Sequence, residues 1–251
     1  MAGRVEVHDL GANVDYAAAT AIQARCHADR RAGRISDTLL LLEHAPVYTL
    51  GRSAQPENVR WSEAELQKAG ITRVSTTRGG DVTYHGPGQL VGYPIIHLSQ
   101  RGMGVLDYVT AIEETLIRAL ADLGLPDAGR DARNRGVWVG NDKIGAIGIR
   151  VAHQVTEHGF ALNINTRLDH YDGIVPCGLT DAGVTSLARH LGHAADMAEV
   201  KRAVTRRFAE VFGYDEVVRH DPATTASSPV RAASASSALS CLCCLYLTLM
   251  R

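Results

Sequence analysis

Apolar residues recur along this chain at two spacings, and each spacing predicts one kind of secondary structure. Steps of three and four residues predict a helix over 106–123, which Gly124 ends, and another over 197–212. The alanine-rich stretch 14–31 favours a further helix. Alternating apolar positions or β-branched runs predict strands at 5–10, 38–43, 47–50, 71–77 and 160–164.

Turn and cap residues add two local predictions. Ser62, with Glu65 three residues later, is typical of a capping box for a helix over 61–69 that ends at Gly70. The segment G-V-W-V-G-N-D-K-I-G-A-I-G-I-R alternates on both sides of Asn141-Asp142, which predicts a hairpin turn and puts Lys143 just after it. Because hairpins are mixed with separate helices, the expected fold class is α+β, with a mixed or antiparallel sheet flanked by helices.

The last part of the chain differs in composition from the rest. Between 221 and 240, 16 of 20 residues are Ala, Ser, Thr or Pro, which bury too little apolar surface to order themselves. The apolar run C-L-C-C-L-Y-L-T-L-M that follows is shorter than the about 20 residues that cross a bilayer. We expect one domain over 1–218 and a disordered linker and tail over 219–251. A lipidated tail, a partner-binding tail and a zinc site at its cysteines are the alternatives.

Composition and charge exclude several classes of protein. With 251 residues and 45% hydrophobic composition, the chain has enough apolar side chains for a core. Its net charge of -1 gives no whole-protein field to hold nucleic acid or an anionic membrane. The N-terminus lacks the features of a secretory signal, so the cytoplasm is the expected location. No disulfide framework is expected from the cysteines at 26, 177, 241, 243 and 244.

The densest run of chemically active residue types is R-G-G-D-V-T-Y-H-G-P-G-Q-L-V-G-Y-P at 78–94. Five glycines and two prolines in 17 residues forbid a helix and indicate backbone held close to something. The run is therefore predicted to be a loop. A loop that only turns a corner does not require Arg78, Asp81 and His85 in the same stretch, so it favours a binding site. No glycine-rich phosphate motif matches, so a nucleotide is not indicated.

Cys177 lies between Pro176 and Gly178 in the segment G-I-V-P-C-G-L. A stiff proline and a glycine without a side chain would leave this thiol poorly screened, with amide donors beside it. Such an environment suits a cysteine that acts as a nucleophile. A cysteine nucleophile predicts acyl transfer through a covalent thioester, which also requires a base, an oxyanion site and an acyl pocket.

These motifs together resemble those of the lipoyl(octanoyl) transferases. In chain order they are R-G-G-D-V-T-Y-H-G-P-G-Q, G-N-D-K-I-G-A-I-G, H-G-F-A-L-N-I-N, G-I-V-P-C-G-L and G-V-T-S-L, and the resemblance covers about 4–215. It implies a fold like that of the biotin and lipoate protein ligases, and an octanoyltransferase catalytic domain over 1–218. The implied reaction, the first step of protein lipoylation, moves an octanoyl group from octanoyl-acyl carrier protein to a lysine of lipoyl domains. These acceptors include the lipoyl domains of 2-oxoacid dehydrogenases and the glycine cleavage H protein.

The resemblance also assigns roles to individual residues. The family's acyl-accepting cysteine falls on Cys177 and its essential lysine on Lys143. Its substrate-binding positions fall on Arg78, Gly79, Gly80, Asp81, Val82, Thr83, Tyr84, His85, Ala146, Ile147, Gly148, His158, Gly159, Phe160 and Ala161. Neither nucleic acid nor a membrane is an expected partner, and the chain is expected to be a monomer.

A thiol is mostly protonated at neutral pH, so Cys177 requires help to ionise. Lys143 can take the proton as an uncharged base or, when charged, pair with the thiolate, and the sequence leaves both roles open. Attack on a thioester donor is nearly isoenergetic, so neither ATP nor another cofactor is expected.

Two other functions stay open at this point. A lipoate protein ligase would activate a free acid with ATP and would not need Cys177, whereas an inactive binding module would only hold acyl or lipoyl groups. Arg130, Arg133 and Arg135 form either a docking patch for an acidic carrier protein or a solvated loop. Two histidines are three residues apart without a third ligand nearby, so no metal site is predicted for His190 and His193.

Overall fold

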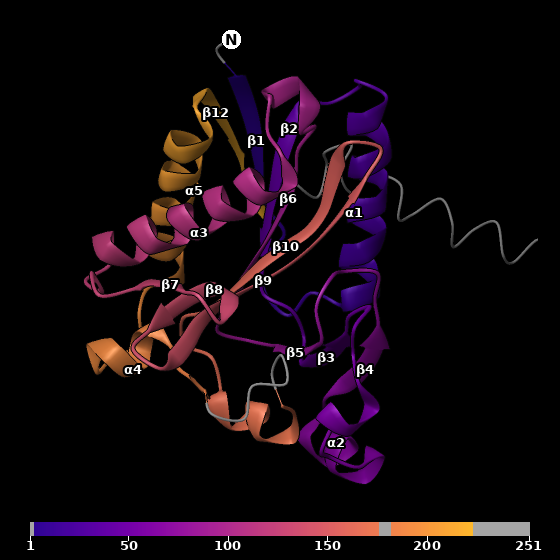
Figure 1. Cartoon of the computed structure of the whole chain (residues 1–251), viewed down its shortest axis with the longest axis vertical. Helices are drawn as coiled ribbons and strands as arrows, with labels where there is room; N and C mark the ends of the chain where they lie inside the picture. Colours follow the sequence, from indigo (N-terminus) through magenta and orange to yellow (C-terminus); the bar gives the residue numbers. More distant parts are fainter. Residues whose placement is uncertain (1–2, 176–181, 223–251) are drawn as a thin grey trace, which may run out of the picture.

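A computed structural model describes residues 3–175 and 182–222 of the chain, and its centre is one large mixed sheet (Figure 1). The strand order is β12-β1-β2-β6-β10-β9-β8-β7, with β11 paired to β9. The strands of this sheet are β1 (Gly3–Asp9), β2 (Asp37–Leu42), β6 (Gln89–Ile95), β7 (Gly129–Asp131), β8 (Asn134–Val139), β9 (Asp142–Ala152), β10 (Val155–Asn163), β11 (Gly183–Val184) and β12 (Tyr214–His220).

Strand directions confirm the predicted mixed α+β class. Strand β1 is parallel to both of its neighbours, β2 and β12, whereas β2, β6, β10, β9, β8 and β7 follow one another antiparallel. A second, smaller sheet has the order β4-β3-β5 and lies with α2 at one end of the molecule (Figure 1). Its strands are β3 (Val47–Leu50), β4 (Thr72–Ser75) and β5 (Val82–His85).

Helices cover both faces of the large sheet. In Figure 1, α3 and α5 lie side by side on one face and α1 lies against the other. Strand β2 shows why: Leu39 and Leu41 pack into the core under α3 and α5, whereas Leu40 and Leu42 pack with α1. The helices are α1 (Tyr16–Arg31), α2 (Glu63–Ala69), α3 (Val105–Asp122), α4 (Leu187–Leu191) and α5 (Met197–Phe212), and the short 3-10 turns are η1 (Pro56–Asn58), η2 (Ser99–Arg101) and η3 (Leu168–Gly173).

Local sequence signals set the ends of several helices as predicted. The Ser62 side chain accepts from the amide of Glu65, whose carboxylate accepts from the amide of Ser62 at 2.7 Å, so the capping box is present. Gly70 ends α2 in the left-handed conformation that glycine favours. Helix α5 begins after an Asp196 cap and spans the predicted residues.

Two predictions require correction. The hairpin turn lies at Gly140-Asn141 rather than Asn141-Asp142, because Val139 and Asp142 are already paired. Gly140 takes the positive φ of 58° that opens this turn, a conformation that glycine adopts without strain. The glycine block at 78–89 is also not one loop: its non-glycine core forms β5, which pairs with β3 while the glycines stay at its ends.

The C-terminal end of the sheet extends into the segment that was predicted as a tail. Strand β12 pairs with β1 up to His220, so 219–220 are part of the sheet. Residues 223–251 lie outside the described residues, and the prediction for them stays a prediction. Among the residues that the structure describes, no helix has the length and apolar character needed to cross a membrane.

Candidate active site

Most of the sequence-predicted substrate-binding residues line one cavity, which is partly open to solvent. Strands β9 and β10 form one wall, and β5 with the loop before it forms another. Predicted residues on the lining are Arg78, Gly79, Gly80, Asp81, Val82, Thr83, His85, Lys143, Ala146, Ile147, Gly148, His158, Gly159, Phe160 and Ala161. The cavity also includes Tyr16 of α1 and Tyr93 of β6.

Tyr84 is the predicted substrate-binding residue that does not belong to this lining. Successive side chains of a strand point to opposite faces, so Tyr84 shares the face of Val82, and both side chains belong to the core cluster of the small sheet. It is fully buried and packs edge-on against Tyr48, and its hydroxyl lies 2.9 Å from Nδ1 of His170. We therefore assign Tyr84 to the core between the small sheet and η3.

Cys177 lies outside the described residues, but the chain on both sides of it is described. Before it, the amide of Val175 donates to the carbonyl of Asn58 at 2.8 Å. After it, Val184 pairs with Lys143 in the ladder of β11 and β9, and the amide of Thr185 donates to the Lys143 carbonyl at 3.0 Å. Residues 183–185 therefore run along the same strand that carries Lys143.

Lys143 is positioned by the β8-β9 hairpin. Its side chain is 8% exposed, and its Nζ donates to Oδ1 of Asn134 at 2.7 Å. Nζ also lies 5.1 Å from the centre of the Trp138 ring, within cation–π range. Gly136 leaves room for the lysine stem, because a Cβ there would lie 2.7 Å from Cε of Lys143. Three residues of one hairpin thus define where this amine lies.

Arg78 fixes the loop that precedes β5. Its Nε and Nη2 donate to the hydroxyl oxygen of Thr49 at 3.2 and 2.9 Å, and its Nη1 donates to the Gly79 carbonyl at 3.0 Å. Gly148 permits this packing, because a Cβ at that position would lie 3.1 Å from Cδ of Arg78. The amide of Gly79 also donates to the Ile149 carbonyl at 2.9 Å, so the loop is attached to β9.

His85 is a buried, neutral imidazole with an assignable tautomer. Burial lowers its pKa well below the usual value, and the imidazole of His44 acts in the same direction. The Thr49 hydroxyl already accepts from Arg78, so its hydrogen points to Nε2 of His85, 3.3 Å away. Nδ1 therefore carries the proton and donates to Oε1 of Gln89 at 2.8 Å. His85 is held at both nitrogens, as a positioning group would be.

Gln89 connects this imidazole to the chain that follows Cys177. Its Nε2 lies 3.0 Å from both Oδ1 of Asn163 and the Tyr171 hydroxyl. Nδ2 of Asn163 in turn donates to the carbonyl of Thr185 at 3.1 Å. Because a buried polar network is costly to leave half satisfied, the change of one member disturbs the others.

Two further imidazoles near the cavity are also neutral at neutral pH. Burial lowers the pKa of His44 and of His158 to about 4 in each case. Nδ1 of His44 faces the Val14 carbonyl at 3.0 Å and must donate, so its Nε2 accepts from the Tyr93 hydroxyl at 2.7 Å. The carboxylate of Asp81 accepts a hydrogen bond from the Val82 amide at 2.7 Å. The cavity thus offers apolar walls and neutral rings beside Lys143.

The three arginines considered as a docking patch are each paired with internal carboxylates. Arg130 and Arg135 both contact Oε2 of Glu113, at 3.1 and 3.3 Å, and Arg133 contacts Asp131 at 2.7 Å. Glu113 is buried under them. Much of the positive charge is therefore compensated within the fold, which favours a structural role.

Sequence reasoning missed three positions at or next to the cavity. Tyr16 comes from α1, and nothing in the helical pattern marks a lining residue. Thr49 bridges Arg78 and His85 but lies in an ordinary strand sequence. Asn163 lies inside the quoted motif H-G-F-A-L-N-I-N, where a polar residue within an apolar strand was the available signal.

Comparison with known sequences gives a family match over residues 15–209, to the lipoyl protein ligase A/B catalytic domain. An octanoyltransferase of Alkaliphilus metalliredigens is 47% identical over 84% of this chain and 96% of its own length. An octanoyltransferase of Myxococcus xanthus is 46% identical over 90% of this chain. The match spans 64% of the length of the Myxococcus protein.

The fold is also similar to that of a solved structure described as a lipoate protein ligase of T. acidophilum with bound lipoic acid. The TM-score is 0.73 at 18% sequence identity, over 96% of this chain and 95% of that one. The expected ligase-like fold is therefore confirmed.

Proposed function

Since the chain belongs to the family of lipoyl protein ligase A/B catalytic domains and is an acyltransferase acting in octanoyl transfer, we propose that Cys177 carries the octanoyl group. The proposed donor is octanoyl-acyl carrier protein, and the proposed acceptor is a lysine of a lipoyl domain. Lys143 is the proposed activating group for the thiol.

In the first step the thiolate of Cys177 attacks the thioester carbonyl of the donor. The new C–S bond forms to Sγ while the bond to the carrier's sulfur breaks, and the carrier leaves as a thiol after taking up a proton. One thioester replaces another, so the step is nearly isoenergetic and requires no ATP. Lys143 either removes the thiol proton or, when charged, stabilises the thiolate.

In the second step the uncharged amine of the acceptor lysine attacks the acyl-enzyme. An amide forms, the C–S bond to Cys177 breaks, and the sulfur leaves as a thiolate, while the attacking nitrogen gives up one proton. Because an amide is more stable than a thioester, this step runs downhill. Backbone amides near the reacting carbonyl would stabilise its developing negative charge.

The single observation that carries the proposal is the pairing of the chain after Cys177 with the strand that bears Lys143. Val184 is the ladder partner of Lys143, and Thr185 donates to the same residue's carbonyl. The seven residues from Cys177 to Val184 span at most about 25 Å, a chain length that permits the proposed approach of the thiol to the amine. Asn163, which accepts from Gln89, donates to the carbonyl of Thr185, the residue after Val184.

The cavity beside Lys143 suits a medium-length acyl chain. Ala146, Ile147, Phe160 and Ala161 give it an apolar wall. Burial of the six methylenes of an octanoyl chain contributes about 5 kcal/mol at about 0.8 kcal/mol each. We propose that the neutral state of His85 favours binding of the acyl chain, because a charged ring beside that chain would have to be desolvated.

A reconstituted assay tests the proposal: the full chain, octanoyl-acyl carrier protein and a lipoyl domain are mixed without ATP, and octanoylation of the domain is followed. We expect transfer by the natural chain and by the control variant Cys241→Ser, and loss of transfer in Cys177→Ser. If transfer requires ATP with free octanoate and survives Cys177→Ser, the chain is a ligase instead. If neither condition gives transfer, it only binds acyl groups.

A further inference from the structure

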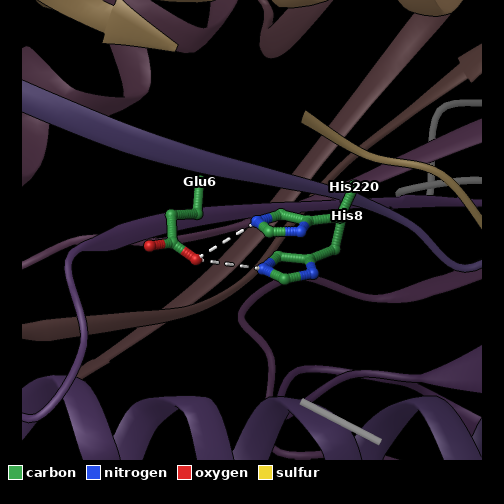
Figure 2. Close-up of side chains that lie close together, drawn as sticks. All are labelled: Glu6, His8 and His220. Atoms are coloured by element: carbon green, nitrogen blue, oxygen red, sulfur yellow. Dashed lines mark ion pairs between the residues drawn. The ribbon is translucent and has the colours of Figure 1, made fainter. Parts of the chain in front are cut away.

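A second cluster of ligand-type side chains lies on the large sheet, among residues that do not line the acyl cavity. It consists of Glu6 and His8 of β1 and His220 of β12, and one ligand atom of each lies within 4.8 Å of the others. Figure 2 shows the two imidazoles stacked, with a nitrogen of each directed at the same oxygen of Glu6.

The register of the two strands explains why these residues meet. His8 and His220 are direct partners in the parallel pairing of β1 with β12. Glu6 precedes His8 by two residues and so lies on the same face of β1. The two rings stack with centres 4.2 Å apart and planes 6° from parallel, which brings both Nε2 atoms to one side.

The spacing of the three atoms fits metal ligands better than hydrogen-bond partners. Nε2 of His8 lies 3.6 Å and Nε2 of His220 lies 3.4 Å from Oε2 of Glu6. Hydrogen bonds between such atoms are normally about 2.7–3.2 Å long. Two ligands on a tetrahedral metal with bonds of about 2.0 Å are separated by about 3.3 Å, which is close to both observed distances.

The imidazole of His8 is buried without hydrogen-bond partners. Its side chain is 2% exposed, and neither ring nitrogen has a hydrogen-bond partner among the residues that the structure describes. A buried polar side chain without a partner is rare and costly, and an ion is one of its recognised explanations.

Arg4 orients the carboxylate for this role. Its Nη2 donates to Oε1 of Glu6 at 3.1 Å, so Oε2 is the oxygen that faces both histidines. Such contacts from outside the ligand set are typical of metal sites, where they fix the ligand's orientation.

We propose that Glu6, His8 and His220 form a binding site for a divalent metal ion of the zinc class. Two imidazole nitrogens and one carboxylate oxygen are a donor set that suits Zn²⁺, Co²⁺ or Ni²⁺, with a water in the fourth position. The site joins β1, the first strand along the chain, to its neighbour β12, the last strand along the chain. A bound ion therefore clips β1 to β12 and stabilises the fold without taking part in acyl transfer.

The experiment measures Co²⁺ and Zn²⁺ binding to the full chain. The tail cysteines at 241, 243 and 244 are replaced by serine in every sample, because thiolates also bind these metals. The test variants are His220→Ala and Glu6→Gln, and His193→Ala is the control for an exposed histidine. Binding is followed by equilibrium dialysis, the Co²⁺ absorption spectrum and thermal unfolding.

We expect one ion per chain, a spectrum without a thiolate band, and a rise in Tm of about 5–10 °C at a metal concentration 100-fold above Kd. Affinity should fall at least tenfold in both test variants and stay unchanged in His193→Ala. Absence of binding overturns the proposal, as does equal affinity in His220→Ala and the unsubstituted histidine background. Octanoyl transfer does not enter any of these three readouts, so failure of this proposal leaves the proposed acyl transfer untouched, and the reverse also holds.

Discussion

The hydrogen bond between Lys143 and Asn134 offers a direct test of how the proposed base is positioned. In Asn134→Ala the Nζ of Lys143 loses the acceptor that lies 2.7 Å away, while the contact with the Trp138 ring stays. Hydrogen bonds to charged groups contribute about 1.5–3 kcal/mol, which corresponds to about 10- to 150-fold in rate. Because Asn134 is only half-buried, water can replace part of the bond, and we expect a loss of about tenfold.

The assay is the rate at which Cys177 gains an octanoyl group from excess octanoyl-acyl carrier protein, followed by rapid quenching and intact-mass spectrometry. Asn134→Asp keeps an acceptor and should retain most of the rate, whereas Lys143→Ala should lose about 100-fold or more. Asn141→Ala is the matched control, because its Oδ1 accepts from exposed Arg133 in the same hairpin.

The pH dependence of the same rate separates the two roles open to Lys143. If the uncharged amine acts as a base, removal of an acceptor that favours the charged form moves the rising limb of the profile to lower pH. If the charged form pairs with the thiolate, the rate falls at every pH. An unchanged rate together with an unchanged pH profile in Asn134→Ala would refute the positioning role.

Two further predictions concern stability. Gly159→Ala places a Cβ 2.2 Å from the carbonyl oxygen of Gly92, so urea unfolding should show a loss of about 3 kcal/mol or no folded protein. Gly129→Ala, with no atom within 4 Å of its Cβ, should change the unfolding free energy little, and equal effects of the two substitutions would contradict the packing argument. Folding lowers the pKa values of His44 and His158 from 6.5 to about 4, so the unfolded chain takes up protons at a higher pH than the folded chain does. The stabilisation from these neutral rings should therefore be fully present above about pH 6.5. The free energy of unfolding, measured with urea at each pH, should fall by several kcal/mol toward pH 4. A flat profile over that window would show that these rings are not buried neutral.

Much of the fold follows from local signals that act over a few residues. The Ser62 capping box, the Gly70 stop and the 197–212 periodicity each determine an element through contacts within one or two turns. The hairpin turn was displaced by one residue because the positive φ at Gly140 outweighs the turn preference of the Asn-Asp pair.

The candidate site was predictable where one motif carries several lining residues. Arg78 and His85 belong to one run of sequence, so a single motif predicted both. The prediction was limited to residues within such motifs. Tyr84 does not line the cavity, because the side chains of β5 alternate between two faces. An interpretation of this run as a loop predicts no such alternation. Tyr16 comes from a distant helix that only tertiary packing brings to the cavity.

The proposed metal cluster marks the limit of sequence reasoning. Glu6 and His8 are two residues apart, but His220 reaches them only through the parallel pairing of the first and last strands. No spacing rule connects residues near opposite ends of a chain. His190 and His193 are only three residues apart in sequence, but Nε2 of His190 lies 3.0 Å from the Thr185 hydroxyl, which gives this ring a hydrogen-bond partner within the fold.

The central claim is that one sulfur atom carries the acyl group between two proteins. Intact-mass spectrometry of the full chain after exposure to octanoyl-acyl carrier protein, followed by addition of a lipoyl domain, tests it most directly. The account predicts one octanoyl group on Cys177, its disappearance as the domain gains it, and no adduct in Cys177→Ser. Transfer at an undiminished rate by the serine variant, or transfer without any adduct, would contradict it.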